Sequence, residues 1–210
     1  MSRYAAERRD MVELLKERGI TDTRLLGAFE RVERHLFVPE PFTSRSYDDC
    51  ALPIQKGQTI SQPYTVAFMT QSLMLQDGAK VLEVGTGSGY QAAILAELGL
   101  RVYTIERDLD LLAGARKLLE KLNYRVAAKG GDGTVGWSEF APYDGIIVTA
   151  GAPDIPKPLM QQLADGGRLV IPVGDRDIQA LVVVTRCGTQ YERRRIDGFK
   201  FVPLIGKEGW

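Results

Sequence analysis

Hydrophobic and polar positions follow two different patterns along this chain. Residues 4–18 and 21–32 carry apolar side chains at helical spacing, with a break at Gly19, and predict two amphipathic helices. From residue 80 the pattern changes to short, nearly continuous apolar runs separated by amphipathic stretches. Strands buried on both faces have this composition, so the runs predict strands at 80–85, 101–106, 125–130, 143–150 and 167–174.

The stretches between these runs predict helices at 89–98, 110–122 and 156–164. Alternating strands and helices are typical of a doubly wound, mostly parallel α/β sheet with helices on both faces. The final apolar runs, 180–186, 191–196 and 199–204, predict antiparallel strands that close one edge. We therefore expect a single domain over residues 1–210, with an N-terminal helical and loop region (1–76) and the sheet with its C-terminal strands (77–210).

Composition and charge narrow the choice of partner. Lys plus Arg and Asp plus Glu both number 27, so no overall charge attracts nucleic acid or a membrane surface, and Arg193–Arg195 fit the solvated face of a strand. Two separated cysteines and a single histidine cannot build a usual zinc site, so we expect no metal. Without a secretory or membrane-spanning apolar run, a cytoplasmic protein is expected, and we expect a monomer.

A glycine-rich loop follows the first predicted strand. Gly85, Gly87 and Gly89 allow a sharp turn and a close approach of the backbone to a ligand at the start of a helix. Dinucleotide sites have the pattern GxGxxG, which requires glycine at 90, where this chain has Tyr90. The loop therefore argues against a nicotinamide cofactor.

Three acidic residues lie at successive strand ends, where ligands collect in such sheets. Glu83 suits the amino acid end of a ligand. Glu106 can accept both hydroxyl hydrogens of a ribose, although a helix-start carboxylate beside Asp108 is an equal alternative. Asp132, between two glycines, can accept a bond from a purine amine, although a plain turn is equally natural. Together they match S-adenosylmethionine.

The stretch ALPIQKGQTISQPYTVAFM at 51–69 contains two prolines, and its role is a separate question. Pro53 and Pro63 stiffen it, and Pro63 also suits the first turn of a helix. Ser61 then lies at the end of a rigid loop. On this stretch alone, Ser61 or Gln62 could simply cap the helix that follows.

The chain resembles the protein L-isoaspartate O-methyltransferases over nearly its whole length. The matching motifs, in order, are RHLFVP (34–39), YDDCALPI (47–54), GQTISQPY (57–64), VLEVGTGSGYQAA (81–93), GDGTVGW (131–137), PYDGIIVTA (142–150), GGRLVIPVG (166–174) and FVPLIGKEGW (201–210). The resemblance implies the class I S-adenosylmethionine-dependent methyltransferase fold, which is Rossmann-like.

The same resemblance assigns roles to residues. It implies that Ser61 is the active-site hydroxyl, that Thr59, Ile60 and Gln62 wall the substrate side, and that the cofactor is contacted by Glu83, Gly85, Thr86, Gly87, Ser88, Glu106, Arg107, Gly131, Asp132 and Gly133. A peptide substrate would be recognised by main-chain hydrogen bonds, which we expect along an edge strand near Val202 and Leu204.

The implied reaction is methylation of the α-carboxylate of L-isoaspartyl residues in damaged proteins and peptides, leading to repair through a succinimide. A carboxylate with a pKa near 3.9 is already ionised at neutral pH, so the transfer needs no general base. Ser61 would then position the carboxylate. Two alternatives remain at this point, namely a methyltransferase acting on another carboxylate or small molecule, and a non-enzymatic cofactor-binding module.

Overall fold

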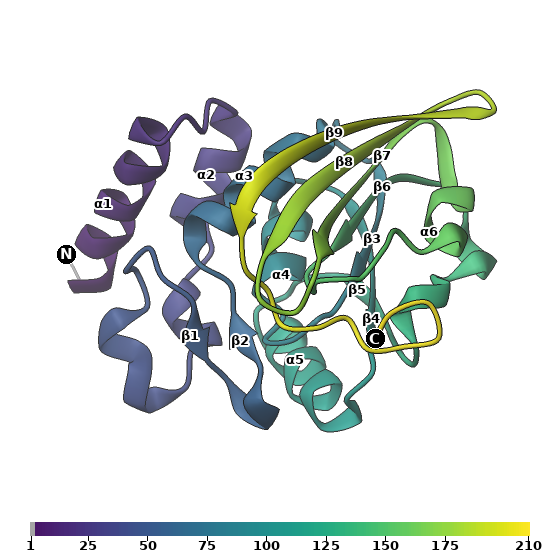
Figure 1. Cartoon of the computed structure of the whole chain (residues 1–210). Helices are drawn as coiled ribbons and strands as arrows, with labels where there is room; N and C mark the ends of the chain where they lie inside the picture. The colour runs from purple at the N-terminus through teal and green to yellow at the C-terminus, as the bar shows by residue number, and fades with distance from the viewer. Residues whose placement is uncertain (1–2) are drawn as a thin grey trace.

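A computed structural model describes residues 3–210 of the chain (Figure 1). Two N-terminal helices, α1 (Arg3–Glu17) and α2 (Thr23–Arg31), occupy the predicted positions. The side chain of Asp22 caps α2 by accepting hydrogen bonds from the amides of Arg24 and Leu25. The apolar stripe of α2 is buried, so both predicted helices are confirmed as part of the packed structure.

The segment between α2 and the central sheet is more structured than a stiff loop. Leu52 pairs with Ile60, and Pro53 with Thr59, in a small antiparallel hairpin. The next helix begins at Pro63, as predicted, since proline suits the first helical position. In chain order the elements here are η1 (Arg34–Phe37), η2 (Glu40–Arg45), β1 (Leu52–Pro53), η3 (Gln55–Gly57), β2 (Thr59–Ile60) and α3 (Pro63–Leu73).

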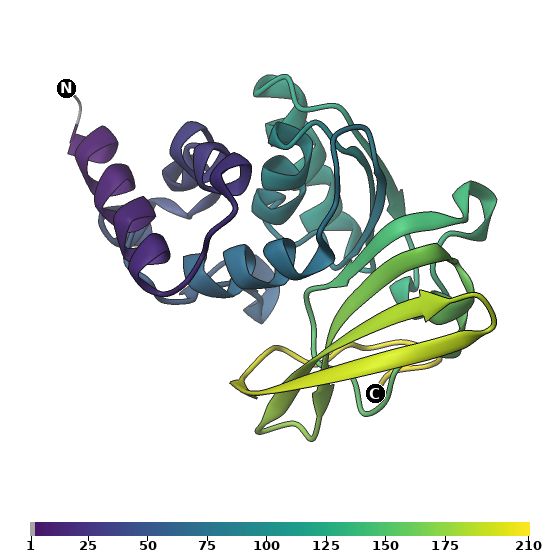
Figure 2. The same cartoon turned by 90° about the horizontal axis from the view of Figure 1, so that it is seen from above.

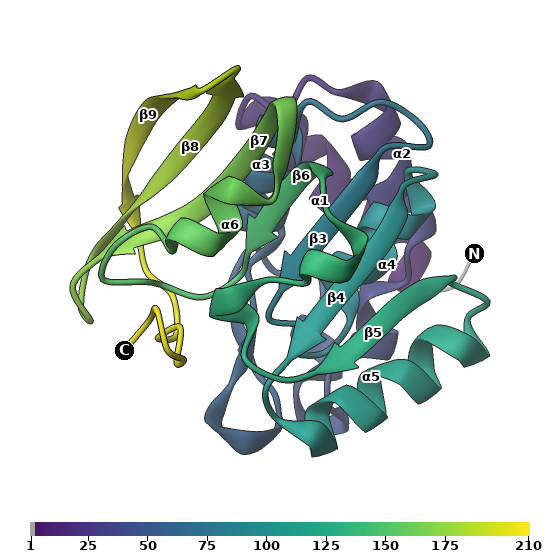
Figure 3. The same cartoon turned by 90° about the vertical axis from the view of Figure 1, so that its right-hand side faces the viewer.

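A seven-stranded sheet in the order β5-β4-β3-β6-β7-β8-β9 forms the centre of the molecule (Figure 3). All neighbours from β5 to β7 run parallel, while β8 and β9 run antiparallel and confirm the predicted edge. The strands are β3 (Lys80–Val84), β4 (Arg101–Glu106), β5 (Val126–Gly130), β6 (Tyr143–Val148), β7 (Leu163–Gly174), β8 (Gln179–Cys187) and β9 (Gln190–Phe199).

The predicted third edge strand at 199–204 is wrong. The last strand, β9, ends at Phe199, and the following residues join the sheet only through an isolated bridge between Gly151 and Pro203. Gly198, with a φ of 95°, lies in a bulge after which Phe199 still pairs with Gln179, and farther along Pro203 has no N–H to offer a ladder. The C-terminal segment (residues 200–210) therefore leaves the sheet and crosses toward its other strands.

The two faces of the sheet are covered unequally (Figure 2). On one face, a core that includes Val81 and Ile147 packs against α1–α3, α4 (Tyr90–Glu97) and α5 (Leu109–Lys121). The opposite face, with Leu82 and Ile146, is covered by α6 (Lys157–Gln161), the 3₁₀ turns η4 (Gly133–Val135) and η5 (Ser138–Phe140), and the C-terminal segment. The sequence predicts helices on both faces, but the second face is covered mainly by short helical turns and by the C-terminal segment.

The strand order places a ligand crevice at a defined point. From β3 the chain proceeds outward through β4 to β5, then returns to form β6 on the other side of β3. In sheets of this type, ligands bind outside the carboxyl ends of the strands where the order reverses. Within residues 3–210 we find no helix with the length and apolar character needed to cross a membrane.

Candidate functional site

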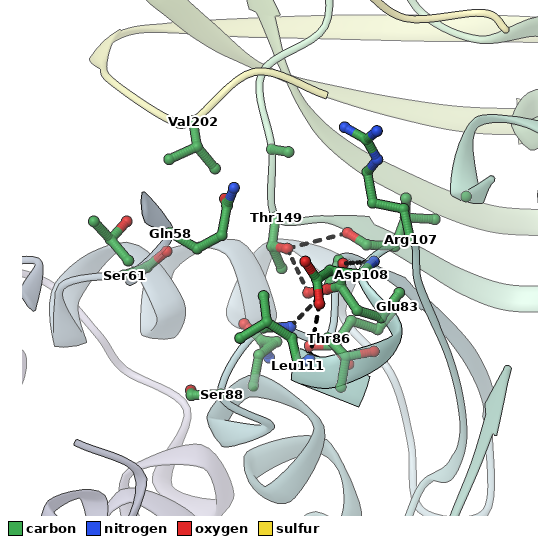
Figure 4. A pocket seen from close by; sticks show the side chains of 18 of the residues that line it. Gln58, Ser61, Glu83, Thr86, Ser88, Arg107, Asp108, Leu111, Thr149 and Val202 are labelled. Atoms are coloured by element: carbon green, nitrogen blue, oxygen red, sulfur yellow. Dashed lines mark hydrogen bonds between the residues drawn. The ribbon is translucent and has the colours of Figure 1, made fainter. Parts of the chain in front are cut away.

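A pocket of about 390 Å³ lies at the carboxyl ends of β3, β4 and β6 (Figure 4). The β1–β2 hairpin region and the C-terminal segment complete its walls. In Figure 4, Ser61 and Gln58 lie toward one end of the pocket, and Glu83 and Thr86 toward the other. The predicted site residues that line it are Thr59, Ile60, Ser61, Glu83, Gly85, Thr86, Gly87, Ser88, Glu106, Arg107, Gly133, Val202 and Leu204.

Glu83 is a fully buried carboxyl at the inner end of this pocket. Its cross-strand partner Thr104 donates a hydroxyl hydrogen to Oε2 at 2.5 Å, and the Thr104 and Thr86 hydroxyls are hydrogen-bonded to each other at 2.6 Å. Oε1 has no hydrogen-bond partner in the described chain. Burial raises the pKa of Glu83 to about 8, against the opposing hydrogen bond from Thr104. A buried carboxyl with a free oxygen fits a cationic ligand group such as the ammonium of S-adenosylmethionine.

The glycine loop needs glycine at 85 for a steric reason. Gly85 has a φ of 96°, and a Cβ there would collide with Oγ1 of Thr149. The Thr149 hydroxyl donates to the carbonyl oxygen of Gly85 at 2.7 Å. Thr149 follows β6 and lines the pocket, yet sequence reasoning missed it. Its place at a strand end was the signal that could have found it.

Glu106 organises the loop and the next helix at once. Oε2 accepts a hydrogen bond from the Gly87 amide at 2.9 Å, and Oε1 accepts one from the Asp108 amide at 3.0 Å. The N-cap of α5 is Asp108, whose Oδ1 accepts from the amides of Asp110 and Leu111. The helix-cap alternative therefore belongs to Asp108, and the remaining lone pairs of Glu106 face a pocket that it lines.

Three predicted site residues, Gln62, Gly131 and Asp132, are not among those that line the pocket. Asp132 is engaged by the protein itself. Oδ1 accepts from the amide and hydroxyl of Thr134, at 2.9 and 2.7 Å, and Oδ2 accepts from the amide of Lys207 at 2.8 Å. Asp132 thus caps η4 and ties down the C-terminal segment, and its contact with a purine amine stays a prediction.

Ser61 lies between β2 and α3, in the wall of the pocket. The interpretation of Ser61 or Gln62 as a helix cap is wrong, because the Gln62 side chain makes no capping bond and the Ser61 hydroxyl makes no hydrogen bond to the described residues. A distant carboxylate supplies the cap instead, since Asp49 Oδ1 accepts from the Tyr64 amide at 2.8 Å. The Ser61 hydroxyl is therefore available to a ligand.

Val202 and Leu204 line the pocket without forming an edge strand. The Val202 carbonyl accepts from the Gly151 amide at 2.8 Å, and the Leu204 amide donates to the Gly151 carbonyl at 2.7 Å. The Leu204 carbonyl accepts from the Trp210 amide at 2.8 Å. The main chain of Leu204 is therefore satisfied internally, and a substrate would meet this residue through its side chain.

The hairpin contributes two pocket residues that the sequence did not indicate, Lys56 and Gln58. Lys56 has a φ of 58° and forms an ion pair with Asp110 of α5, with Nζ and Oδ2 2.6 Å apart. The hairpin is thereby joined to the helix that follows Glu106. Both residues of this pair lie far apart in sequence, so only the folded chain reveals the contact.

Comparisons with known proteins identify the family to which the chain is similar. The model of the family described as Protein-L-isoaspartate(D-aspartate) O-methyltransferase matches residues 6–209. The chain is 55% identical over 208 residues to the Protein-L-isoaspartate O-methyltransferase of Dictyoglomus thermophilum, covering 99% of this chain and 94% of the relative. For the protein of the same name from Chlorobaculum tepidum, the identity is 56% over 207 residues, covering 98% and 97%.

Two solved structures extend the likeness to the fold. A protein-L-isoaspartate O-methyltransferase superposes with a TM-score of 0.88 at 28% identity, covering 96% of this chain and 67% of the other. A putative protein-L-isoaspartate O-methyltransferase from Plasmodium falciparum, in complex with S-adenosyl-L-homocysteine, gives a TM-score of 0.82 at 25% identity, covering 98% and 99%.

Proposed function

Because the chain belongs to the protein-L-isoaspartate(D-aspartate) O-methyltransferase family, we propose that its pocket binds S-adenosylmethionine at Glu83 and Glu106 and an isoaspartyl carboxylate beside Ser61. The enzyme methylates the α-carboxylate of L-isoaspartyl residues in damaged proteins and peptides. The following backbone nitrogen then attacks the methyl ester and expels methanol, which gives a succinimide whose hydrolysis partly restores normal aspartate. The observation that carries the residue assignment is the free Oε1 of the fully buried Glu83, at the opposite end of the pocket from Ser61.

The cofactor side of the pocket is matched to a ligand with a cation at one end and a ribose beyond it. Glu83 offers the ammonium an unpaired carboxylate oxygen, and Glu106 offers the ribose hydroxyls its remaining lone pairs. Gly85 and Gly87 bring the backbone close to the ligand without side chains in the way. When bound, S-adenosylmethionine supplies an electrophilic methyl group.

The substrate side of the pocket has to align a carboxylate that is already ionised. The Ser61 hydroxyl, which has no partner in the described chain, can donate a hydrogen bond to one carboxylate oxygen and leave the other free to react. Ile60 is buried in the same wall and helps to keep water away. Orientation of reactants can contribute about 7 kcal/mol or more, so a positioning role for Ser61 is enough.

We propose further that the enzyme acts as a monomer and binds no nucleic acid. The N-terminal hairpin and the C-terminal segment of the same chain both wall the pocket. The balanced count of acidic and basic residues supplies no attraction for a polyanion. A single copy of the enzyme would then bind and methylate a damaged protein or peptide.

Labelled methyl transfer tests the function directly. We expect transfer from S-adenosylmethionine to an isoaspartyl peptide and none to the matched aspartyl peptide. Ser61→Ala should lower kcat at least about tenfold while the Kd of S-adenosylhomocysteine and the melting temperature stay unchanged, because the lost contact serves only the substrate. Equal methylation of both peptides would contradict the substrate, and full activity of Ser61→Ala would contradict the role of the serine.

A further inference from the structure

Arg34, at the start of η1, has no exposed surface at all. Arginine is almost never fully buried unless it is paired, because the guanidinium loses its hydration. Arg34 forms no ion pair within residues 3–210, and burial lowers the pKa of its guanidinium, against a weaker opposing effect of the Asp49 carboxylate. A charge placed this deeply without a direct counter-ion calls for an explanation beyond stability.

The guanidinium of Arg34 connects three segments that are distant in the sequence. Nε donates to the Ser46 carbonyl at 2.8 Å, and Nη2 donates to the Ser61 carbonyl at 2.9 Å. The centre of the guanidinium lies 4.8 Å from the ring centroid of Tyr90. Tyr90 opens α4 directly after the glycine loop and lines the pocket. One side chain thus joins the serine loop to the helix that begins at the cofactor loop.

The hydrogen bond from Arg34 to the Ser61 carbonyl lies in a short stretch without regular secondary structure. Ser61 lies outside both β2, which ends at Ile60, and α3, which begins at Pro63. Pro63 has no N–H, so the loop lacks one of the donors that a chain usually uses to fix a turn. In the described chain, the partner of the Ser61 carbonyl is Arg34. This bond therefore helps to fix the main chain of Ser61, and with it the position of the hydroxyl.

We propose that Arg34 is a positioning residue for methyl transfer, which holds the main chain of Ser61 against Tyr90 so that the serine hydroxyl meets the substrate carboxylate at the correct distance from the cofactor. The proposal rests on the proposed function of Ser61. Arg34 itself is not among the residues that line the pocket, so it acts through Ser61 and not on the substrate.

Replacing Arg34 by lysine tests the geometry of its hydrogen bonds separately from its charge. Its ammonium keeps the positive charge but is a single point donor, whereas the guanidinium fork serves the two carbonyls at once. Arg34→Lys should therefore release one anchor, and Arg34→Gln should remove the charge as well. Arg168→Lys is the matched control, because Arg168 donates to the carbonyl of Ser72 at 3.2 Å, near the other end of α3, and does not line the pocket.

Hydrogen–deuterium exchange tests the anchor without reference to activity. In Arg34→Lys the amides of residues 58–64 should exchange at least about tenfold faster than in the unaltered protein, while α5 and the central sheet keep their protection. Arg168→Lys should leave residues 58–64 unchanged. Because no substrate is involved, this result stands even if the proposed function fails.

Kinetics with the isoaspartyl peptide test the consequence. Arg34→Lys should lower kcat at least about tenfold and leave the Kd of S-adenosylhomocysteine within about twofold. In the Ser61→Ala background the same substitution should have almost no further effect on kcat, because both changes remove one function. If the role of Arg34 were merely structural, Arg34→Lys would lower kcat by the same factor in the unaltered enzyme and in Ser61→Ala.

The outcomes separate the two proposals. No methylation of isoaspartyl peptides by the unaltered enzyme would overturn the proposed function, while the exchange result would still decide the anchor. Unchanged exchange at 58–64 in Arg34→Lys, or a kcat loss that persists in Ser61→Ala, would overturn the role of Arg34. If neither Arg34→Lys nor Arg34→Gln folds, Arg34 serves the stability of the fold, and the proposed positioning role would be overturned as well.

Discussion

At the scale of single residues, the site depends on carboxyl groups whose surroundings differ. Glu83 is fully buried with one unpaired oxygen, whereas both oxygens of Glu106 already accept backbone amides. A buried carboxyl without charge compensation favours its protonated form, and a cationic ligand reverses that preference. Cofactor binding should therefore be linked to the ionisation of Glu83.

The linkage gives a signed pH dependence. With a folded pKa of about 8 against a reference value of 4.5, Glu83 keeps its proton in the folded state where the unfolded chain loses it. Its contribution to the free energy of unfolding is fully present below pH 4.5 and is lost as pH rises through about 8. The affinity for S-adenosylhomocysteine should instead rise with pH up to about 8, by at most about tenfold per unit.

Calorimetric titration in two buffers of different ionisation enthalpy would measure the proton released on binding at pH 7. Glu83→Gln is the control, because its neutral amide should bind more weakly and without this pH dependence. Binding that releases no proton in the unaltered enzyme would show that Glu83 does not meet the ammonium.

Glu106→Ala should weaken binding of S-adenosylhomocysteine by about 1 to 3 kcal/mol, because the ribose hydroxyls lose their acceptor. Asp22→Ala is the comparison, since Asp22 caps α2 and does not line the pocket, so that its loss costs about 1 kcal/mol of the free energy of unfolding and should barely change the affinity. Titration calorimetry and urea unfolding separate the two effects. An unchanged Kd in a folded Glu106→Ala variant would reduce Glu106 to an organiser of the Gly87 turn.

At the scale of elements, α3 is held at its start by a side chain from another segment. Asp49 accepts the Tyr64 amide and forms an ion pair with Arg18, whose guanidinium lies 3.6 Å from the centroid of the Tyr64 ring. The helix that follows Ser61 is thus fixed from outside by Arg18, directly after α1, and by the loop before β1. Its first turn carries no local cap that could do the same.

Asp49→Ala should lower the free energy of unfolding by about 1 to 2 kcal/mol, the range for a lost N-cap. Asp49→Asn keeps an acceptor for the Tyr64 amide and should recover most of that loss. Ser61→Ala should change stability by no more than a few tenths of a kcal/mol, since its hydroxyl caps nothing. Urea denaturation would measure all three, and a larger loss in Ser61→Ala than in Asp49→Ala would restore the capping role of the serine.

At the scale of the whole molecule, the pocket is completed by segments from both ends of the chain. The hairpin covers it from the N-terminal side, and residues 202–205 cover it from the C-terminal side. The C-terminal segment is attached by the Lys207 amide to Asp132 and by Trp210 Nε1 to the Gly151 carbonyl, at 3.1 Å, and within it the Trp210 amide donates to the Leu204 carbonyl. These bonds connect the loop after β5 to the substrate wall.

Removal of residues 207–210 should therefore loosen the substrate wall more than the cofactor site. We expect the KM for an isoaspartyl peptide to rise at least about tenfold, while the Kd of S-adenosylhomocysteine changes less, because Glu83 and Glu106 stand on strands that remain. Peptide kinetics and calorimetry on the shortened protein would measure both quantities. An unaltered KM would show that the wall formed by Val202 and Leu204 does not contact the substrate.

Local patterns in the sequence predicted much of this fold. The apolar runs located β3, β4, β6 and β7, the break at Gly19 separated the first two helices, and Pro63 marked the start of α3. These features are readable because strand burial, helix periodicity and proline geometry act over a few neighbouring residues. The same reasoning placed the glycine loop and Glu83 at a strand end, where the pocket was found.

Tertiary structure alone decided what each of these parts contacts. The cap of α3 comes from Asp49, the Ser61 carbonyl is held by Arg34, and Asp132 is engaged by Lys207. The run at 199–204 has the apolar composition of a strand, yet the chain leaves the sheet after Phe199, and Pro203 bridges to Gly151 instead. Composition and spacing determine which local conformation a segment prefers, but a hydrogen bond between distant segments depends on how the whole chain packs, which no local pattern records.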